Sequence, residues 1–403
     1  MTHATRRLLL CATAFAGLGA WLPAAQAQAP AEVKIGVLVP MTGGSAADGD
    51  RLLKAHELAA REINEAGGIK ALGGAKVRLV VADTQSKPEV GRSEAERLVS
   101  REKVSAVLGA WASAVTIPTM QVAERYRVPY VVTSAVTDSI TEQNLQFVFR
   151  ISPKGSWAAQ DVAKFLVDLK GRGVPVASVG LVYEDGPYGQ SVSKGYRENF
   201  AAQNIRIVAD ESFRTGSADL STQVAKLKAS GADVVCVVAY VDDETVLVRA
   251  MASQQFKPVL LGYGGGHTHP TLLQLGPLVE GTFGIVEWMP DLNKPAARQF
   301  AAAYQAAYGA LPLSNSAQAY AATWAVGLAL EAGASAEPMK VRDALRTLKR
   351  KDGPASLLPN DELAFDAQGQ NKVGNVVSQV QGGRFVTVWP EAVASQPIRI
   401  LDR

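Results

Sequence analysis

The run Val33-Lys-Ile-Gly-Val-Leu-Val39 and the helical pattern from Asp48 to Ala66 establish the architecture of the chain. The first segment is short, apolar and rich in β-branched residues, which predicts a strand. In the second segment, small and apolar residues return on one helical face, at Leu52, Ala55, Ala59, Ile63 and Ala66. Gly67-Gly68 predicts the helix end, because glycine is common just past a helix C-terminus. The fold therefore begins with a strand and a helix.

The same alternation continues along the chain. Further strands are predicted at 77–82, 104–109, 128–133, 176–183, 205–208, 234–239 and 259–262. Helices are predicted at 89–102, between the strands 104–109 and 128–133, and at 189–203, 220–230 and 244–255. Strict alternation predicts parallel sheets with helices on both faces. The stretches 33–151 and 176–283 show a similar alternation of strands and helices, so each is predicted to form one doubly wound α/β domain. Two domains also agree with the length of 403 residues, which exceeds what one core usually serves.

The remaining pattern leaves one question open. Helices are predicted at 296–308, 316–332 and 339–348, followed by a β-hairpin of 376–380 and 384–389 around Gln381-Gly-Gly383. The helical block fits a third domain, and it fits equally well a return to cover the first domain.

Residues 1–29 have the pattern of a cleavable export signal. Arg6 and Arg7 precede an apolar run from Leu8 to Leu22, and small residues suited to cleavage follow at Ala25-Gln-Ala27 and Ala27-Gln-Ala29. Export by the general and by the twin-arginine route both fit. No other segment is apolar for long enough to cross a membrane. The sequence thus predicts an exported soluble protein.

Charge and composition exclude several classes of protein. The formal net charge is +3, and removal of the signal leaves 39 basic against 38 acidic residues, which is too little to indicate a nucleic-acid partner. Two cysteines and four histidines make a disulfide scaffold or a zinc site a poor prediction. Cys236 lies in an apolar run and is expected to be buried. We expect a monomer with no metal and no cofactor.

Ligands of open α/β sheets bind beyond the carboxyl ends of the strands. Three such ends carry small, hydroxyl-bearing residues, in the segments Gly43–Ser45, Gly109–Ser113 and Thr133–Thr137. Free backbone N–H groups and a hydroxyl at a helix N-terminus attract a carboxylate or phosphate. The alternative is that these hydroxyls are only helix caps. Aromatic residues near strand ends fit either the wall of a small-molecule cleft or the core, namely Trp111, Tyr188, Tyr240, Tyr263, Trp288 and Tyr320.

No assembled catalytic set is evident in the sequence. Gly262–Gly266 lacks the third glycine of a dinucleotide loop, and no phosphate-binding loop or nucleophile elbow occurs. His267-Thr-His269 offers two metal ligands without an obvious third. The paired acids Glu184-Asp185 and Asp242-Asp243 fit a site for a cation and fit solvated turns. The sequence does not predict an enzyme.

The mature chain resembles the periplasmic solute-binding proteins of the leucine/isoleucine/valine type, which serve ABC importers. The resemblance is carried by Lys34-Ile-Gly-Val-Leu-Val-Pro-Met-Thr-Gly43, Glu62-Ile-Asn-Glu-Ala-Gly-Gly68, Val80-Val-Ala-Asp83, Val107-Leu-Gly-Ala-Trp-Ala-Ser113, Val128-Pro-Tyr-Val-Val-Thr-Ser134, Val182-Tyr-Glu-Asp-Gly-Pro-Tyr-Gly189 and Leu363-Ala-Phe-Asp-Ala-Gln-Gly369. It implies the type I periplasmic-binding fold, in which three crossings join two α/β lobes and a hinge closes the cleft. It also implies an N-terminal lobe of 30–152 and 284–357 and a C-terminal lobe of 153–283 and 358–403.

The resemblance further implies a ligand site. The carboxylate of the ligand is expected at Ser113 and at the backbone of Ala135, Val136 and Thr137, with Tyr188 and Tyr240 covering the ligand from the second lobe. We add Ser45, Trp111 and Tyr263 as neighbours of these strand ends.

Amino-acid binders of this type carry an acid after the strand that here ends at Gly262, and the aligned residue is Gly264. A buried ammonium without a partner is costly, so an aromatic or other organic acid is the alternative ligand, with Tyr263 and His267 as hydrogen-bond partners. The expected function is capture of a small carboxylate for an importer permease. An exported enzyme with His267 as base, and a ligand-binding partner of a sensory receptor, are the alternatives.

Overall fold

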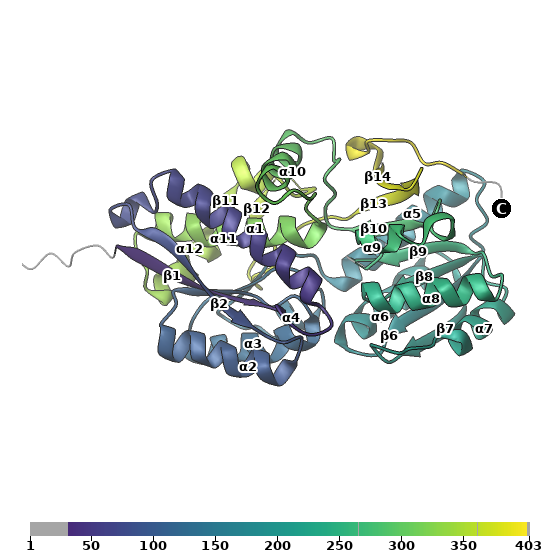
Figure 1. Ribbon diagram of the computed structural model, residues 1–403, viewed down its shortest axis with the longest axis horizontal. Coiled ribbons are helices and arrows are strands. Elements are labelled where there is room, and N and C mark those ends of the chain that lie inside the picture. The colour runs from purple at the N-terminus through teal and green to yellow at the C-terminus, as the bar shows by residue number, and fades with distance from the viewer. Residues whose placement is uncertain (1–30, 265, 361, 401–403) are drawn as a thin grey trace, which may run out of the picture.

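The computed structural model describes residues 31–264, 266–360 and 362–400. The predicted export signal, 1–29, lies outside the described residues. The chain forms two lobes that lie side by side, each built on its own sheet (Figure 1). Within the described residues, no helix is both long and apolar enough to span a membrane.

The first lobe contains a five-stranded parallel sheet of order β2-β1-β3-β4-β5. Its strands are β1 (Glu32–Val39), β2 (Lys76–Asp83), β3 (Ala106–Gly109), β4 (Tyr130–Val132) and β5 (Val148–Arg150). β1 pairs along its full length with β2, from Glu32 opposite Lys76 to Val39 opposite Asp83. The apolar runs that predicted the first four strands therefore form this sheet, whereas β5 was not predicted.

Helices cover both faces of the first sheet. They are α1 (Ala46–Glu65), α2 (Pro88–Arg97), which continues as a π-helical turn at Leu98–Glu102, α3 (Ser113–Tyr126), α4 (Ser139–Glu142), α10 (Pro295–Tyr308), α11 (Ser314–Gly333) and α12 (Pro338–Thr347). One core joins β1 to α1 and α11, and another joins it to α2 and α3 (Figure 1). The predicted helical block therefore packs on the first sheet and forms no third domain. Gly327 permits the close approach, since a Cβ there would lie 2.8 Å from Ile63 Cδ1.

The second lobe contains a seven-stranded sheet of order β14-β13-β10-β9-β8-β6-β7. Its strands are β6 (Ser178–Glu184), β7 (Arg206–Phe213), β8 (Val234–Val238), β9 (Val259–Tyr263), β10 (Phe283–Val286), β13 (Val376–Gln381) and β14 (Arg384–Trp389). β6 to β10 are parallel, and the predicted hairpin β13–β14 adds to β10 in antiparallel fashion. α5 (Gly155–Gly171) and α6 (Pro187–Ala202) share one core with this sheet. On its other face lie α7 (Ser221–Ala229) and α8 (Val241–Ser253), while α9 (Pro270–Leu273) is a single turn.

Two predicted lobe boundaries disagree with the sheet or core to which the neighbouring residues belong. The boundary at residue 284 falls inside β10, which belongs to the second sheet as far as Val286. The boundary at residue 358 falls before Leu358, Leu363 and Phe365, which are buried in the core of the first lobe. Tertiary packing places these segments, because each is too short for periodicity to assign. The chain passes between the sheets three times, at 151–154, 287–294 and 365–375.

Candidate functional site

The carboxyl ends of the strands in both sheets border a cleft between the lobes. Strand order reverses between β1 and β3 in the first sheet and between β6 and β8 in the second, and such reversals create the crevice in which open sheets bind ligands. Two cavities lie there, an inner one of about 60 Å³ and an outer one of about 420 Å³. Both are lined by Trp111, Ala112 and Tyr240, so the two cavities adjoin each other in the cleft.

The inner cavity brings together most of the predicted site residues. Its walls include Trp111, Ser113, Ala135, Val136, Tyr188, Tyr240, Tyr263 and Gly264. They come from strand ends of both lobes, because Ser113 begins α3, Ala135 follows β4, and Tyr263 ends β9.

The loop after β4 is turned so that its carbonyl groups are occupied. The carbonyl of Ala135 accepts a hydrogen bond from Ser152 Oγ (2.9 Å), that of Val136 accepts from Gly155 N–H (2.8 Å), and that of Thr137 accepts from Arg150 Nη1 (2.8 Å). Within the described part of the chain, the N–H groups of Ala135 and Val136 donate to no protein acceptor. Buried backbone donors are nearly always satisfied, so this loop offers donors to a bound group.

Aromatic rings form a row across the cleft. The ring of Trp111 lies 5.1 Å from that of Tyr240, which lies 5.5 Å from Tyr188, and Tyr188 lies 5.9 Å from Tyr263. Tyr188 Oη donates to the carbonyl of Tyr263 (2.8 Å). Burial raises the pKa of Tyr188, Tyr240 and Tyr263, so all three hydroxyls remain neutral donors. Trp111 has a φ of 90°, a strained conformation of the kind found at functional sites.

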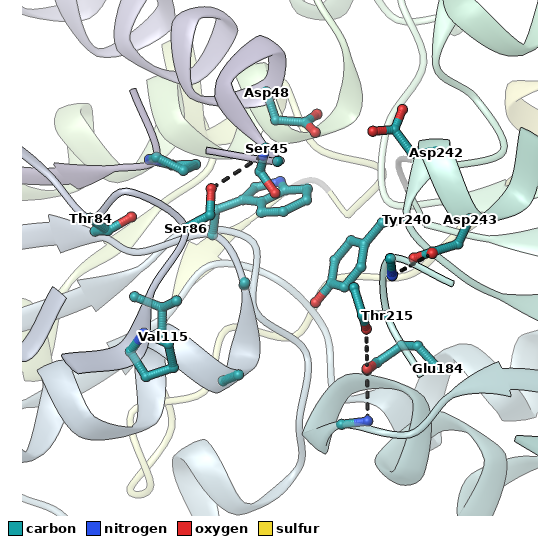
Figure 2. A pocket seen from close by; sticks show the side chains of 18 of the residues that line it. Ser45, Asp48, Thr84, Ser86, Val115, Glu184, Thr215, Tyr240, Asp242 and Asp243 are labelled. Atoms are coloured by element: carbon teal, nitrogen blue, oxygen red, sulfur yellow. Dashed lines mark hydrogen bonds between the residues drawn. The ribbon is translucent and has the colours of Figure 1, made fainter. Parts of the chain in front are cut away.

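The outer cavity is acidic and contains Ser45. Figure 2 shows Asp48 and Ser45 on one side and Asp242, Asp243 and Glu184 on the other. Burial raises the pKa of Asp48 to about 6, although a hydrogen bond from Asn315 opposes the shift. Burial likewise raises the pKa of Asp243 to about 6. These carboxyl groups create a negative potential at the mouth of the inner cavity.

Two predicted residues do not line either cavity. Thr137 Oγ1 donates to the carbonyl of Pro187 (3.0 Å), a contact between the lobes. His267 is fully buried, with Nδ1 2.5 Å from Glu244 Oε1 and Nε2 3.1 Å from Thr282 Oγ1. Both ring nitrogens are therefore occupied, and the predicted roles of His267 as ligand partner or base do not fit its position. It lies over Gly262, where a Cβ would be 2.5 Å from the imidazole.

The structure adds polar residues that the sequence did not indicate. Glu287, Ser314, Asn315 and Gln318 also line the inner cavity, together with Ser134 of the predicted segment Thr133–Thr137. Glu287 follows β10, a strand that was not predicted, and Asn315 lies in the first turn of α11. The one available signal was the acid directly after the apolar run 283–286.

The two histidines His267 and His269 do not form a metal centre. His269 Nδ1 accepts the N–H of Thr271 (3.2 Å) and caps α9. Among the described residues, no group of three or more histidine, cysteine, aspartate or glutamate side chains is arranged to hold a metal ion.

Comparison with known proteins identifies a matching family model, relatives in sequence and similar solved structures. A family model described as periplasmic binding protein matches residues 32–383. Leu/Ile/Val-binding protein homolog 8 of Brucella melitensis is 33% identical over 385 residues, covering 92% of this chain and 93% of that protein. The leucine-binding protein LivK of Thermotoga maritima has a similar structure, with a TM-score of 0.79 at 25% identity over 90% of this chain and 98% of that one. A solute-binding protein of R. palustris, solved with benzoate, shares the fold at a TM-score of 0.78 and 18% identity, over 91% of this chain and 98% of that one.

Proposed function

The chain belongs to the periplasmic binding protein family, and on that premise we propose that it captures a small carboxylate-bearing solute in the cleft between its lobes for an ABC importer. Its partner is then the membrane permease of that importer, and its place is the periplasm, reached through the predicted export signal. A monomer suffices for this role, because both walls of the cleft come from one chain.

The observation that carries the proposal is the group of hydrogen-bond donors on one wall of the inner cavity. The unpaired N–H groups of Ala135 and Val136 lie on its wall together with Ser113, the first residue of the 14-residue helix α3. Ser134 Oγ is buried on the same wall and has no partner among the described residues. Several donors and the positive end of a helix dipole suit a carboxylate.

Closure of the cleft explains how a solute is enclosed. The lobes touch through Thr137 Oγ1 and the carbonyl of Pro187, and the N–H of Asp138 donates to Ser191 Oγ (3.1 Å). The three segments 151–154, 287–294 and 365–375 connect the lobes. We propose that bending at these segments opens the cleft and that a bound solute favours the closed form.

Two measurements test this function. Native mass spectrometry of the protein purified from its host identifies a retained solute. Isothermal titration calorimetry with amino acids, benzoates and other small acids measures affinity without turnover. Ser113→Ala is expected to weaken binding by about 10-fold to 100-fold, since a hydrogen bond to a charged group contributes roughly 1.5–3 kcal/mol.

The matched control is Ser230→Ala at the end of α7, where the hydroxyl only caps the carbonyl of Leu227. It should leave the affinity unchanged. If none of the small acids binds the wild-type protein, the carboxylate function is refuted.

A further inference from the structure

We propose that Glu287 and Asn315 bind a positively charged nitrogen of the solute, so that the solute is an amino acid and not a bare organic or aromatic acid. The inference rests on the proposed function, because it places the carboxylate of the same solute at the loop after β4. It adds a second anchor in the inner cavity, provided by the segment after β10 and by α11.

The charges around the cleft favour a solute that carries a cation. The described residues that line the two cavities include carboxyl groups, at Asp48, Glu184, Asp185, Asp242, Asp243 and Glu287. The same lining residues include no lysine, arginine or histidine. A bare carboxylate would bring a further negative charge into this surrounding, whereas a zwitterion brings its own positive charge. The acids alone do not show which of them receives that charge.

Two of the acids on the outer cavity already hold backbone groups. Glu184 accepts the N–H groups of Gly186 and Gly189, both at 2.7 Å. Asp243 Oδ1 accepts the N–H of Gly216 at 2.7 Å. These contacts hold the loops at the rim of the cleft. Glu184 and Asp243 therefore contribute to the negative electrostatic potential of the cleft, while their oxygens already accept hydrogen bonds from the backbone.

The position after β9 offers no acid and no space for one. Gly264 has a φ of 80°, which side chains rarely adopt, and a Cβ there would lie 2.7 Å from Tyr188 Oη. A larger residue would displace Tyr188 from the carbonyl of Tyr263. An acid that reaches the inner cavity must therefore come from another strand end.

Glu287 reaches the cavity from the neighbouring strand. β10 is parallel to β9, with Ile285 opposite Tyr263, and Glu287 lies just past its end. Glu287 is 5% exposed; its Oε1 accepts from Tyr263 Oη (3.3 Å) and its Oε2 from Ser314 Oγ (2.8 Å). Burial raises its pKa, and hydrogen bonds from Ser314, its own backbone N–H, Tyr263 and Gln318 oppose the shift. All of these donors are neutral and no cation is among the causes of the shift, so the buried carboxylate has no charged partner in the described chain.

Asn315 provides an independent sign of a missing donor. Its Nδ2 donates to Asp48 Oδ1 (3.1 Å), which fixes the orientation of the amide, because only the NH₂ group can donate to a carboxylate. Asn315 is 5% exposed and lines the inner cavity, and its Oδ1 is buried without a partner in the described chain. A buried acceptor without a donor is unfavourable, and an ammonium group supplies donors to both Asn315 and Glu287.

The inner cavity thus has donors from the loop after β4 and acceptors from Glu287 and Asn315. An α-amino acid carries the complementary pair of groups, a carboxylate and an ammonium, on one carbon atom. Its side chain then extends into the outer cavity of about 420 Å³. A solute that lacks the ammonium would place its carboxylate in the same small cavity as the buried Glu287 carboxylate, with no positive charge between them.

The test uses calorimetry on the mature protein with three kinds of probe: the proteinogenic amino acids, their deaminated analogues such as 4-methylpentanoate for leucine, and benzoate. At least one amino acid should bind, and its deaminated analogue should bind about 100-fold more weakly, since a buried charge would lose its partner. Glu287→Gln keeps the shape of the side chain and should weaken that amino acid by about 100-fold as well. Glu198→Gln, which makes the same change at an exposed acid of α6 paired with Lys194 (3.9 Å), should change the affinity by less than about threefold.

The outcomes separate the two proposals. Binding of benzoate or of a deaminated acid as tight as that of any amino acid overturns the ammonium site and leaves the carboxylate function standing. Absence of binding for every probe overturns both. A folded Glu287→Gln protein with unchanged affinity, verified by thermal melting, also overturns the assignment. Should that variant not fold, the comparison of probes on the wild-type protein decides.

Discussion

Arg150 connects the loop that offers the unpaired N–H groups to a segment that joins the lobes. It ends β5 and is fully buried. Nε donates to Gln370 Oε1 (2.7 Å), Nη1 to the carbonyl of Thr137 (2.8 Å), and Nη2 to Thr141 Oγ1 (3.0 Å). We predict that Arg150→Met, which keeps the length of the side chain without its donors, lowers both the stability and the affinity for the solute.

The expected size follows from two opposing contributions. Three hydrogen bonds from a charged donor contribute roughly 1.5–3 kcal/mol each. Against this, burial lowers the pKa of Arg150 from 12.5 to about 10, which corresponds to about 3 kcal/mol of unfavourable desolvation at roughly 1.4 kcal/mol per pKa unit. The variant relieves that cost, so the net loss of unfolding free energy should be about 3 kcal/mol.

Urea unfolding followed by tryptophan fluorescence measures the loss of stability, and calorimetry measures the affinity. The control is Arg172→Met, which removes a half-exposed pair with Asp168 (2.9 Å) and should cost less than about 1 kcal/mol. Arg150→Lys, with a charge but no planar fork, should fall between the two. If Arg150→Met unfolds at the same urea concentration as the control, the reasoning that this guanidinium holds the loop is refuted.

Three further predictions concern other parts of the molecule. Asp48→Asn should raise the unfolding free energy at neutral pH by up to roughly 3 kcal/mol. The pKa of Asp48 in the folded protein, about 6, exceeds the ordinary 3.8, so the native state binds the proton more tightly and the stability of the wild-type protein falls as pH rises from about 4 to 6. The unfolding free energy, measured by denaturation across that pH range, should depend less on pH in the variant, and equal pH dependence would contradict the assignment. Thr137→Ala removes the 3.0 Å contact with Pro187 between the lobes and should weaken affinity by about fivefold, with small-angle scattering showing a more open protein without solute; an unchanged profile speaks against a closing role. Cys236 is fully buried and burial raises its pKa, so a thiol reagent should label it only after denaturation, and rapid labelling of the native protein would show that the core of the second lobe opens.

The local pattern of the chain was sufficient for most of the fold. The β-branched run 234–238 predicted a buried strand, and the helical face of α1 followed from spacing, because both depend on neighbours within a few residues. The missed elements include the long helix α5 (Gly155–Gly171) and two short strands. β5 has three residues and β10 has four, and such segments become strands only because adjacent strands supply their hydrogen bonds.

The candidate site likewise contains residues that the local pattern could place and residues that only tertiary packing brings there. Ser113, Ala135 and Tyr188 could be placed from the sequence, since strand ends in parallel sheets gather at one edge. The position of His267 could not, because it depends on the space above Gly262 and on Glu244, a residue from a different helix. Glu287 and Asn315 come together through the packing of α11 beside the end of β10, a contact between segments that the sequence does not link. Periodicity therefore determined the elements and the sheet edges that border the cleft, whereas the long-range packing of the two lobes selected which polar groups line its cavities.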